Sequence, residues 1–399
     1  MVSGVRRIAV IAVGAAVTAC GSYKPPQQVA NGAVPAPPPP ASTTASSTST
    51  TTTLPAPRSL SVLLTGDILT ERPVLETAAA AATGTANRYD FTSLFAPIAP
   101  LVQSVDLAIC QMELPVGRPG EEPGTKGRSP FGGNRLLAPY EIAPALAVAG
   151  FDRCTTASNH SYDVGDAGID STIDAFEGVG ISWSGTARRP EEFPPSLFEV
   201  GNVKVAHLSY TRRSNTPWPA EPWRLAYTDD PAAIARDVAT ARAGGADVVI
   251  VSIHVFKELT SEPIAENRAF AEAITALADV DAVIHHGPHV VQSVEVVNGT
   301  PVWWSIGNLL SGMARPGASD RYTDPRTRDG LGAVLRFTET SAGVWATTWS
   351  SVVLCNEQRS RVIHAGVAAL QDPALQDPAL RAELEGCVER TRAAVPDAG

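Results

Sequence analysis

The stretch DAVIHHGPHVVQSVEVVNG, residues 281–299, begins as a short apolar run. It then places three of the chain's seven histidines within five positions: His285, His286 and His289. The apolar run is typical of a strand that is buried on both faces. Gly287 allows a tight turn and Pro288 fixes φ, so the second and third histidines can point to one cation. The first histidine should point to the opposite face of the strand if the pleat continues.

Similar apolar runs recur along the chain, and each ends in polar residues. They span 60–67, 105–113, 151–160, 202–210, 247–254, 281–286 and 301–308. Patterns with helical periodicity lie between several of them, at 140–150, 166–180, 230–245 and 261–278. Strands that alternate with helices predict an α/β domain.

The polar residues that end these runs are of types that bind metal ions. They are Asp67, Glu113, Asn159, His160, His254, His286 and His289. Ligands of open α/β sheets bind at the carboxyl ends of the strands, so these side chains should meet at one edge. Carboxylate, amide oxygen and imidazole together suit a hard or borderline divalent cation. A single strand-end aspartate more often caps a helix, but five of the seven histidines lie at such ends, which favours a metal site.

Several short motifs are spread over residues 60–337. They are Gly66-Asp67 with Arg72, Gln111-Met112-Glu113, 158-SNHSYDVGDAGIDST-172, His254 with Glu258, 262-EPIAENR-268, His286-Gly287-Pro288-His289 and Ser305-Ile306-Gly307-Asn308. Together they resemble the CapA-type family of poly-γ-glutamate capsule synthesis, a branch of the calcineurin-like metallophosphoesterase fold. The resemblance implies a metallophosphoesterase-like αββα sandwich. Two departures stand out: Gln111 replaces an asparagine of the family pattern, and His285 replaces a glycine.

The resemblance also implies a site with one or two divalent ions, Mn²⁺, Zn²⁺ or Fe. Its metal ligands would be Asp67, Glu113, Asn159, His254, His286 and His289. Metal coordination lowers the pKa of water toward neutrality, which prepares the water to attack a phosphoryl or acyl centre. His160, oriented by Asp163, would protonate the leaving group.

The implied function is a metal-dependent hydrolase that acts with capsule synthesis machinery on poly-γ-glutamate, on a related anionic capsule or cell-envelope polymer, or on a small-molecule substrate. Basic side chains are expected to bind the substrate: Arg72, Arg135, Arg315 and Arg321. The alternative is a non-catalytic, metal-containing, polymer-binding lipoprotein whose ion clamps carboxylates. An enzyme needs an open coordination position with a general acid beside it, whereas a clamp does not.

The amino terminus indicates export. Residues 1–19 combine a basic start with a short apolar run, as in a signal peptide, and Val17-Thr18-Ala19-Cys20 resembles a bacterial lipobox. Cys20 is therefore the expected lipidation site, which would anchor the protein extracytoplasmically to the cell membrane. The alternative is an ordinary signal peptide with an incidental cysteine. Residues 20–58, rich in Pro, Ser and Thr, should form a disordered tether.

The net charge limits the classes of partner, and the length of the chain limits the number of domains. The net charge of −10 argues against a nucleic-acid partner, since phosphate binding needs a basic surface. Residues 59–340 should form the metallophosphoesterase-like domain. Residues 341–399 are expected to be a subsidiary C-terminal extension, either a surface helix or a loose tail.

The four remaining cysteines are expected to differ in their chemistry. Export favours oxidised cysteines. Cys355 and Cys387 are expected to form a disulfide that ties the C-terminal extension to the domain. Cys110 and Cys154 lie on strands that lead into the site and are expected to be buried thiols.

Overall fold

The computed structural model describes residues 57–193, 197–314 and 323–399. The predicted signal peptide, the lipidation site Cys20 and nearly all of the tether lie outside these residues, as do Arg315 and Arg321. Among the described residues, no helix combines the length and the apolar character that a membrane span requires.

In the part of the chain that the structure describes, the first sheet has eight strands, and the strand at residues 59–68 lies inside it. Its order is β16 (Ile363–Ala365), β15 (Val344–Asn356), β14 (Asp329–Ser341), β1 (Ser59–Ile68), β2 (Leu107–Met112), β5 (Arg153–Thr155) and β6 (Ser182–Ser184), and β13 (Asn308–Leu310) also pairs with β1. The strands from β1 to β6 are parallel, and the strands from β14 to β16 extend the sheet as antiparallel neighbours. All residues of β1 except the first are buried, as expected for a strand covered on both faces.

Among the described residues, the second sheet has six strands, and it contains the histidine-rich stretch. Its order is β11 (Val294–Val297), β12 (Thr300–Trp303), β10 (Ala282–His286), β9 (Val248–His254), β8 (Val203–Thr211) and β7 (Leu197–Val200). The four central strands are parallel, and the two edge strands are antiparallel to their neighbours. The quoted stretch therefore forms a central strand, a turn and an edge strand.

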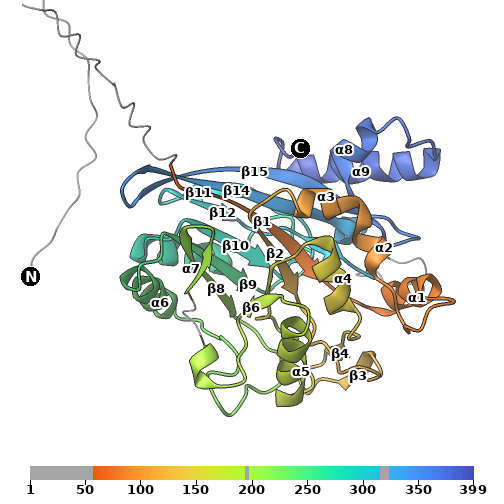
Figure 1. Cartoon of the computed structure of the whole chain (residues 1–399), viewed down its shortest axis with the longest axis horizontal. Coiled ribbons are helices and arrows are strands. Elements are labelled where there is room, and N and C mark those ends of the chain that lie inside the picture. Colours follow the sequence, from red (N-terminus) through yellow and green to blue (C-terminus); the bar gives the residue numbers. More distant parts are fainter. Residues whose placement is uncertain (1–56, 194–196, 315–322) are drawn as a thin grey trace, which may run out of the picture. The chain divides into compact units, whose positions relative to one another are not determined.

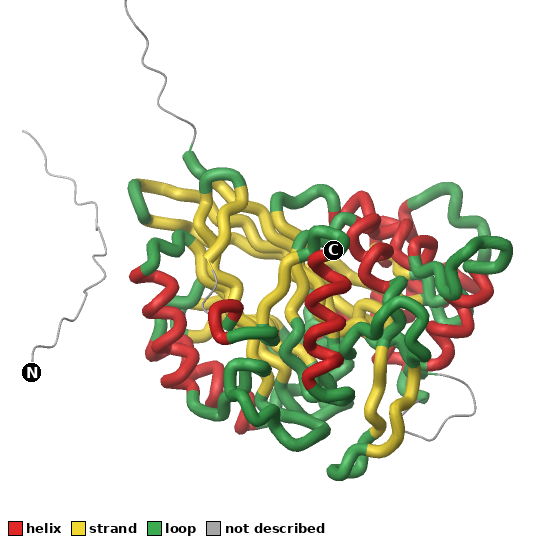
Figure 2. The backbone as a smooth tube through the Cα atoms, turned by 60° about the horizontal axis from the view of Figure 1, so that its bottom comes forward, coloured by secondary structure: helices red, strands yellow, loops and turns green. Residues whose placement is uncertain are grey.

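Three apolar clusters show how the layers stack. One fills the space between the two sheets, with Val62 and Ile284 among its members. A second packs helices against the first sheet: α1 (Arg72–Ala81), α2 (Thr92–Phe95), η1 (Ala96–Ile98), α3 (Ala99–Val102), α4 (Ile142–Ala149) and α5 (Asp166–Glu177). A third packs α6 (Pro231–Ala243) and α7 (Ala265–Leu277) against the second sheet. The layers run helix, sheet, sheet, helix (Figures 1 and 2), so the predicted α/β sandwich is confirmed.

Local sequence signals explain several helix boundaries. Helix α4 ends at Gly150, whose φ of 104° closes the helix in the left-handed conformation that glycine adopts readily. The Asp230 side chain caps α6 by accepting a hydrogen bond from the amide of Ala232. Helix α7 begins at Ala265 rather than at residue 261. The proline at 263 disfavours helical geometry in the residue before it, and Ile264 is extended, with a ψ of 153°.

The C-terminal residues complete the first sheet. Residue 340 lies within β14, which forms a long hairpin with β15, and α8 (Gly366–Gln371) and α9 (Pro378–Ala394) then pack on these strands. The domain boundary expected at 340 thus falls inside a strand of the sheet. The smaller elements are the hairpin of β3 (Gly124–Arg128) and β4 (Asn134–Leu137) and the 3₁₀ turns η2 (Pro190–Glu192) and η4 (Pro325–Arg328).

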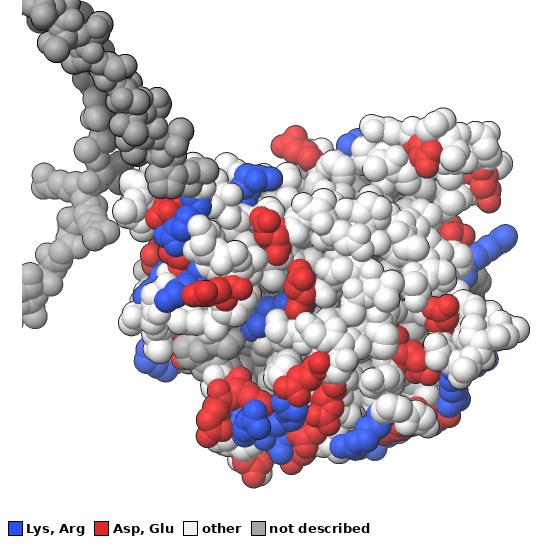
Figure 3. Space-filling view, in the orientation of Figure 1, with Lys and Arg blue, Asp and Glu red and all other residues white. Residues whose placement is uncertain are grey.

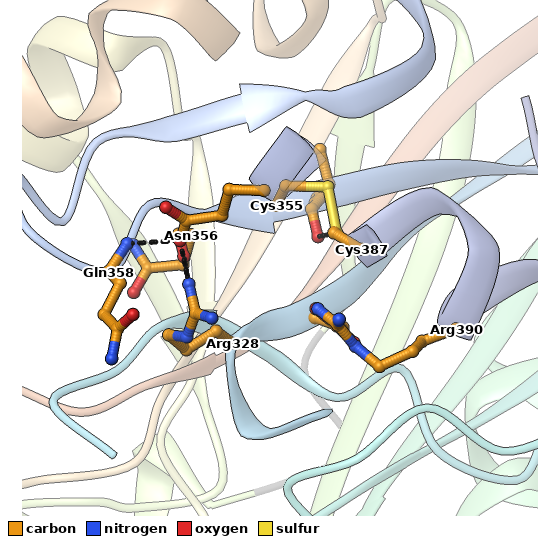
Figure 4. The surroundings of a disulfide bond; sticks show 9 residues. Arg328, Cys355, Asn356, Gln358, Cys387 and Arg390 are labelled. Carbon is orange, nitrogen blue, oxygen red and sulfur yellow. Dashed lines mark hydrogen bonds and ion pairs between the residues drawn. A yellow bond between two sulfur atoms is a disulfide. The ribbon is translucent and has the colours of Figure 1, made fainter. Parts of the chain in front are cut away.

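Both cysteine pairs form disulfides. The predicted Cys355–Cys387 bond joins β15 to α9, with Cα atoms 6.1 Å apart (Figure 4). The expectation that Cys110 and Cys154 are free thiols is wrong. These residues are register partners on the adjacent strands β2 and β5, with Cα atoms 4.4 Å apart, a separation that a disulfide can span.

Charged side chains are interspersed on the surface. On the face drawn in Figure 3, Lys and Arg lie among Asp and Glu rather than in one basic stripe, and a wide area carries neither sign. Salt bridges such as that of Arg188 with Glu177 illustrate this pairing.

Candidate metal centre

Three buried side chains at neighbouring strand ends form the core of the site. Asp67 lies near the end of β1, Glu113 directly follows β2, and His254 ends β9. One ligand atom of each lies within 4.8 Å of those of the other two. They meet because the parallel strands of both sheets direct their carboxyl ends to one edge, as the sequence predicts.

The histidine turn after β10 closes the site from the second sheet. His286 Nδ1 lies 3.5 Å from Asp67 Oδ1, and His289 Nδ1 lies 3.1 Å from Asp67 Oδ2. The Gly287 amide also donates to Asp67 Oδ2, at 3.1 Å. Gly287 has a φ of 99°, and a Cβ there would lie only 2.5 Å from the carbonyl oxygen of Val255. The glycine is therefore required both by its backbone angle and by the close approach of the β9 end.

His285 faces the other way, as predicted from the strand pleat. Its ring meets the ring of Trp304 edge-on, with centroids 5.4 Å apart, on the side of the sheet that α6 and α7 cover. The residue is fully buried, and burial lowers the pKa of its imidazole to about 3. A neutral His285 packed in the core does not belong to the metal ligands.

The donor atoms at this edge fit a divalent cation. Within the described part of the chain, several buried ligand atoms accept or donate no hydrogen bond: Asp67 Oδ1, both Glu113 carboxylate oxygens, Asn159 Oδ1, His254 Nδ1 and both His286 nitrogens. Buried polar atoms without partners are costly and rare in native proteins. Asp67, Glu113 and His254 bring carboxylate and imidazole donors together, and Mn²⁺, Zn²⁺ or Fe bound there would give these atoms the partners they lack.

The charges of the centre depend on one another. Burial raises the pKa of Glu113 to about 7 despite the opposing charge of His289. Burial lowers the pKa of His289, but the carboxylates of Glu113 and Asp67 outweigh burial and raise that pKa to about 10. Burial lowers the pKa of His254 to about 3. The carboxylates thus attract positive charge to this point, and a bound cation would take the place of protons on the imidazoles.

A second polar pair lies beside the first. His160 Nδ1 lies 2.6 Å from Asp163 Oδ2, and its Nε2 lies 4.0 Å from Glu113 Oε1. Asp163 Oδ2 also accepts the amide of Leu136 at 2.7 Å, which holds the carboxylate in place. Burial lowers the pKa of His160, but the hydrogen bond to Asp163 outweighs it and raises that pKa. The neighbouring Asn159 donates to Asn215 Oδ1 at 3.2 Å.

An open pocket of about 540 Å³ adjoins these side chains. Its lining residues are Asn159, Arg213, Ser214, Asn215, His254, Val255, Phe256, Lys257, Glu258, Leu259, Gly287 and His289. Four of these residues, Asn159, His254, Gly287 and His289, belong to the site described above. The pocket therefore opens directly beside the candidate metal centre.

Two of the four arginines predicted to bind substrate, Arg72 and Arg135, lie in the described part of the chain, and neither of these lines the pocket. The Arg72 side chain is 81% exposed at the start of α1 and pairs with Glu76 at 2.6 Å. Arg135 lies in β4, where its Nη2 donates to the backbone oxygen of Lys126. The basic residues that do line the pocket, Arg213 and Lys257, were not predicted from the sequence.

Two further residues were missed as members of the site. Asn308 begins β13, and its side-chain oxygen lies 3.0 Å from His289 Nδ1, while its amide donates to the backbone of Thr327. Its position after a Gly at the end of an apolar run could have identified it. Gln111 is the register partner of Asp67, is fully buried, and has an amide without a hydrogen bond in the described residues.

Comparisons with known proteins agree with the sequence motifs. A family model described as "Bacterial capsule synthesis protein PGA_cap" matches residues 61–313. The capsule biosynthesis protein CapA of Bacillus anthracis is 26% identical over 258 residues, covering 63% of this chain and 59% of that protein. The PGA biosynthesis protein CapA of Bacillus subtilis (strain 168) is 29% identical over 175 residues, covering 43% of this chain and 45% of that one. The matches thus span about half of each curated relative's length.

Two solved structures overlap the backbone only partly. A novel phosphatase from Mycoplasma pneumoniae has a TM-score of 0.41 and 15% identity, covering 74% of this chain and 94% of that chain. The calcineurin-like phosphoesterase YfkN from Bacillus subtilis has a TM-score of 0.42 and 15% identity, covering 73% and 90%. The family match, which covers well over half of the chain and includes most of the predicted metal ligands' strands, is the stronger finding. This chain belongs to the bacterial capsule synthesis protein family PGA_cap.

Proposed function

We propose that this chain is an exported, lipid-anchored CapA-type protein that acts as a metal-dependent hydrolase in the synthesis or export of poly-γ-glutamate or a related anionic capsule polymer. The observation that carries the proposal is the buried cluster of Asp67, Glu113 and His254, whose ligand atoms converge beside the His160–Asp163 pair. The export and the lipid anchor rest on the amino-terminal sequence alone.

The cation would be held by residues from both sheets. Its ligands would be Asp67, Glu113, Asn159, His254, His286 and His289, several of which have unpartnered donor atoms. A divalent cation bound there would supply Lewis-acid activation of water and polarise the bond to be cleaved. The buried carboxylates set the negative potential that attracts the cation, and the turn at Gly287 sets the spacing of the two imidazoles.

The pair of His160 and Asp163 has the arrangement of a general acid and its orienting carboxylate. Because Asp163 accepts the proton on Nδ1, the ring turns its Nε2 toward Glu113 and the site. From that position His160 would donate a proton to the leaving group. Asn215 Nδ2 also lies 3.1 Å from the His160 ring, and its own backbone amide donates to Asn159, so the loop around residue 215 supports the pair.

A second candidate is a metal-containing, polymer-binding lipoprotein without turnover. The number of donors favours it, because six protein ligands around one cation would leave no open coordination position for a water or a substrate. In that case His160 would have a structural role only. The two candidates therefore differ in whether the loss of His160 changes chemistry or only local packing.

The test combines metal analysis with a hydrolysis screen of the purified full chain. We expect metal in the preparation and cleavage of a phosphodiester or a γ-glutamyl substrate. His160→Ala should lower turnover by about 10²- to 10⁴-fold while the metal content stays near the wild-type value. His364→Ala, a change far along the chain on β16, is the matched control and should alter neither quantity. Metal without any hydrolysis would favour the binding protein, and a chain that holds no metal under any condition would refute both candidates.

A further inference from the structure

We propose that Arg213 and Lys257 form an anion subsite in the pocket beside the metal centre, which binds a carboxylate or phosphate group of the substrate next to the bond that reacts. Both residues line the same pocket as His254 and His289. The inference deepens the proposed function and rests on it for the identity of the substrate, but the subsite itself can be measured by binding alone.

The backbone around Arg213 is attached to the metal site at both ends. The Arg212 amide donates to the backbone oxygen of His254 at 3.0 Å, and the Asn215 amide donates to that of Asn159 at 2.8 Å. Both acceptor residues are among the predicted metal ligands. The segment between these two hydrogen bonds therefore holds Arg213 at a defined place beside the centre.

The Arg213 side chain is exposed but positioned. Its guanidinium carbon lies 4.0 Å from the centroid of the Phe256 ring, a cation–π distance, and no ion pair or hydrogen bond of its side chain occurs among the described residues. The preceding Arg212 contrasts with it, because that side chain is buried and paired with Asp229 and Glu266. Arg212 serves the fold, whereas the charge of Arg213 is available to a ligand.

Lys257 is held in an unfavourable backbone conformation. Its φ is 85°, and that of Leu259 is 64°, a region that residues other than glycine rarely adopt. Neighbouring contacts keep the loop there: the Leu259 amide donates to the Pro288 oxygen at 2.9 Å, and the Asn267 amide group donates to the Phe256 oxygen at 3.0 Å. Strain of this kind concentrates at functional sites, and here it places an exposed lysine in the wall of the pocket.

The chemistry of the subsite follows from these two cations. A guanidinium and an ammonium group bind carboxylate and phosphate oxygens by charge-assisted hydrogen bonds. Glu258, the acidic lining residue that is not a predicted ligand, already has an interaction partner. A repeating anionic polymer carries one such group on the unit next to each scissile bond, so the subsite would set the register of the chain on the metal centre.

The test measures binding of two labelled oligomers to the Mn²⁺-loaded full chain by fluorescence anisotropy at low salt. One is a γ-linked glutamate decamer and the other a glycerol-phosphate decamer of matched charge. Arg213→Ala combined with Lys257→Gly should weaken binding by at least about tenfold for each lost contact. Glycine accepts the positive φ at 257, so this part of the variant should unfold at the same temperature as the wild type or a higher one. Arg236→Ala combined with Lys204→Ala removes the same charge from exposed positions outside the pocket and should change affinity less than about twofold.

The outcomes separate the subsite from the hydrolase. Weaker binding of one or both oligomers supports the subsite, and the oligomer affected identifies the anionic group. If the wild type cleaves neither oligomer but the pocket variant binds more weakly, the subsite is supported and the hydrolase is refuted. If the pocket variant binds and cleaves as the wild type does, or if the wild type binds neither oligomer, the subsite is refuted and the metal centre is left as proposed.

Discussion

Gly287→Ala should impair the metal centre by more than the cost of a left-handed backbone at an alanine would explain. Gly287 links the two imidazoles of the histidine turn and lies against the end of β9. A methyl group there would lie 2.5 Å from the Val255 oxygen and 2.8 Å from His254 Nε2, distances that force one of them to move. The chain offers a matched control in Gly132, whose φ of 98° nearly equals the 99° of Gly287 and whose added Cβ would meet no atom within 4 Å.

The expected loss of stability has two contributions, and comparing Gly287→Ala with Gly132→Ala separates them. Both alanines bear the left-handed backbone cost of about 1–2 kcal/mol. Only Gly287→Ala adds overpacking, which typically costs about 1–3 kcal/mol. We therefore expect the free energy of unfolding of the metal-free protein to fall by about 2–5 kcal/mol for Gly287→Ala and by about 1–2 kcal/mol for Gly132→Ala. Because one of the two crowded groups belongs to the predicted ligand His254, metal affinity should fall as well, and only in the first variant.

Urea unfolding in EDTA measures the first quantity, and titration with Mn²⁺ measures the second. The two unfolding curves also show whether each variant is folded before its metal affinity is compared. Equal unfolding midpoints for the two glycine variants, together with wild-type Mn²⁺ affinity for Gly287→Ala, would refute the reasoning. Such a result would mean that the turn relaxes around the methyl group and that its tight geometry is not needed for the centre.

Three other predictions can be checked in the same preparations. His286→Ala and His289→Ala should lower metal affinity by more than the ~10- to 100-fold that loss of an outer-shell partner costs. His285 packs on Trp304, so His285→Ala should keep the metal and lose only stability. Measuring the metal content per chain of the three variants checks this prediction. Cys355→Ser with Cys387→Ser opens a loop of 32 residues and should lower the free energy of unfolding by about 3–4 kcal/mol, measured by urea unfolding with and without reductant, and no difference from the wild type would contradict the bond. Cys20→Ala should release the protein from the membrane fraction, and a variant that still sediments with membranes would disprove the lipobox.

The predicted metal ligands were visible because each follows an apolar run. Three of them lie at the end of a buried strand or in the turn after it: Asp67, His254 and His289. The burial of these strands can be read from their apolar sequence, and parallel strands bring their carboxyl ends to one edge. Asn308 gave the same signal but follows a turn after β12, so its place beside His289 depends on the pairing of β13 with β1. Arg72 was predicted from a motif, and its side chain pairs with Glu76 outside the pocket.

The cysteines show which disulfide could be predicted from the sequence and which could not. The pairing of Cys355 with Cys387 was inferred from their shared place near the carboxyl terminus. The pairing of Cys110 with Cys154 needed the knowledge that β2 and β5 are adjacent and in register, a contact between residues separated by 44 positions. The hairpin that joins β14 to β15 likewise made residues 344–356 part of the sheet.

The sequence by itself determined the strands, the polar residues at their ends and the glycine turn between two histidines, because these depend on burial and backbone angles that neighbours along the chain impose. Only the tertiary structure decided which loops line the pocket. Arg213 and Lys257 lie on irregular segments, and their positions come from hydrogen bonds to His254, Asn159 and Pro288, which are distant in sequence or lie across a strand boundary. A loop has no periodicity from which its direction can be inferred, since its backbone follows the partners that satisfy its hydrogen bonds after the sheets have come together.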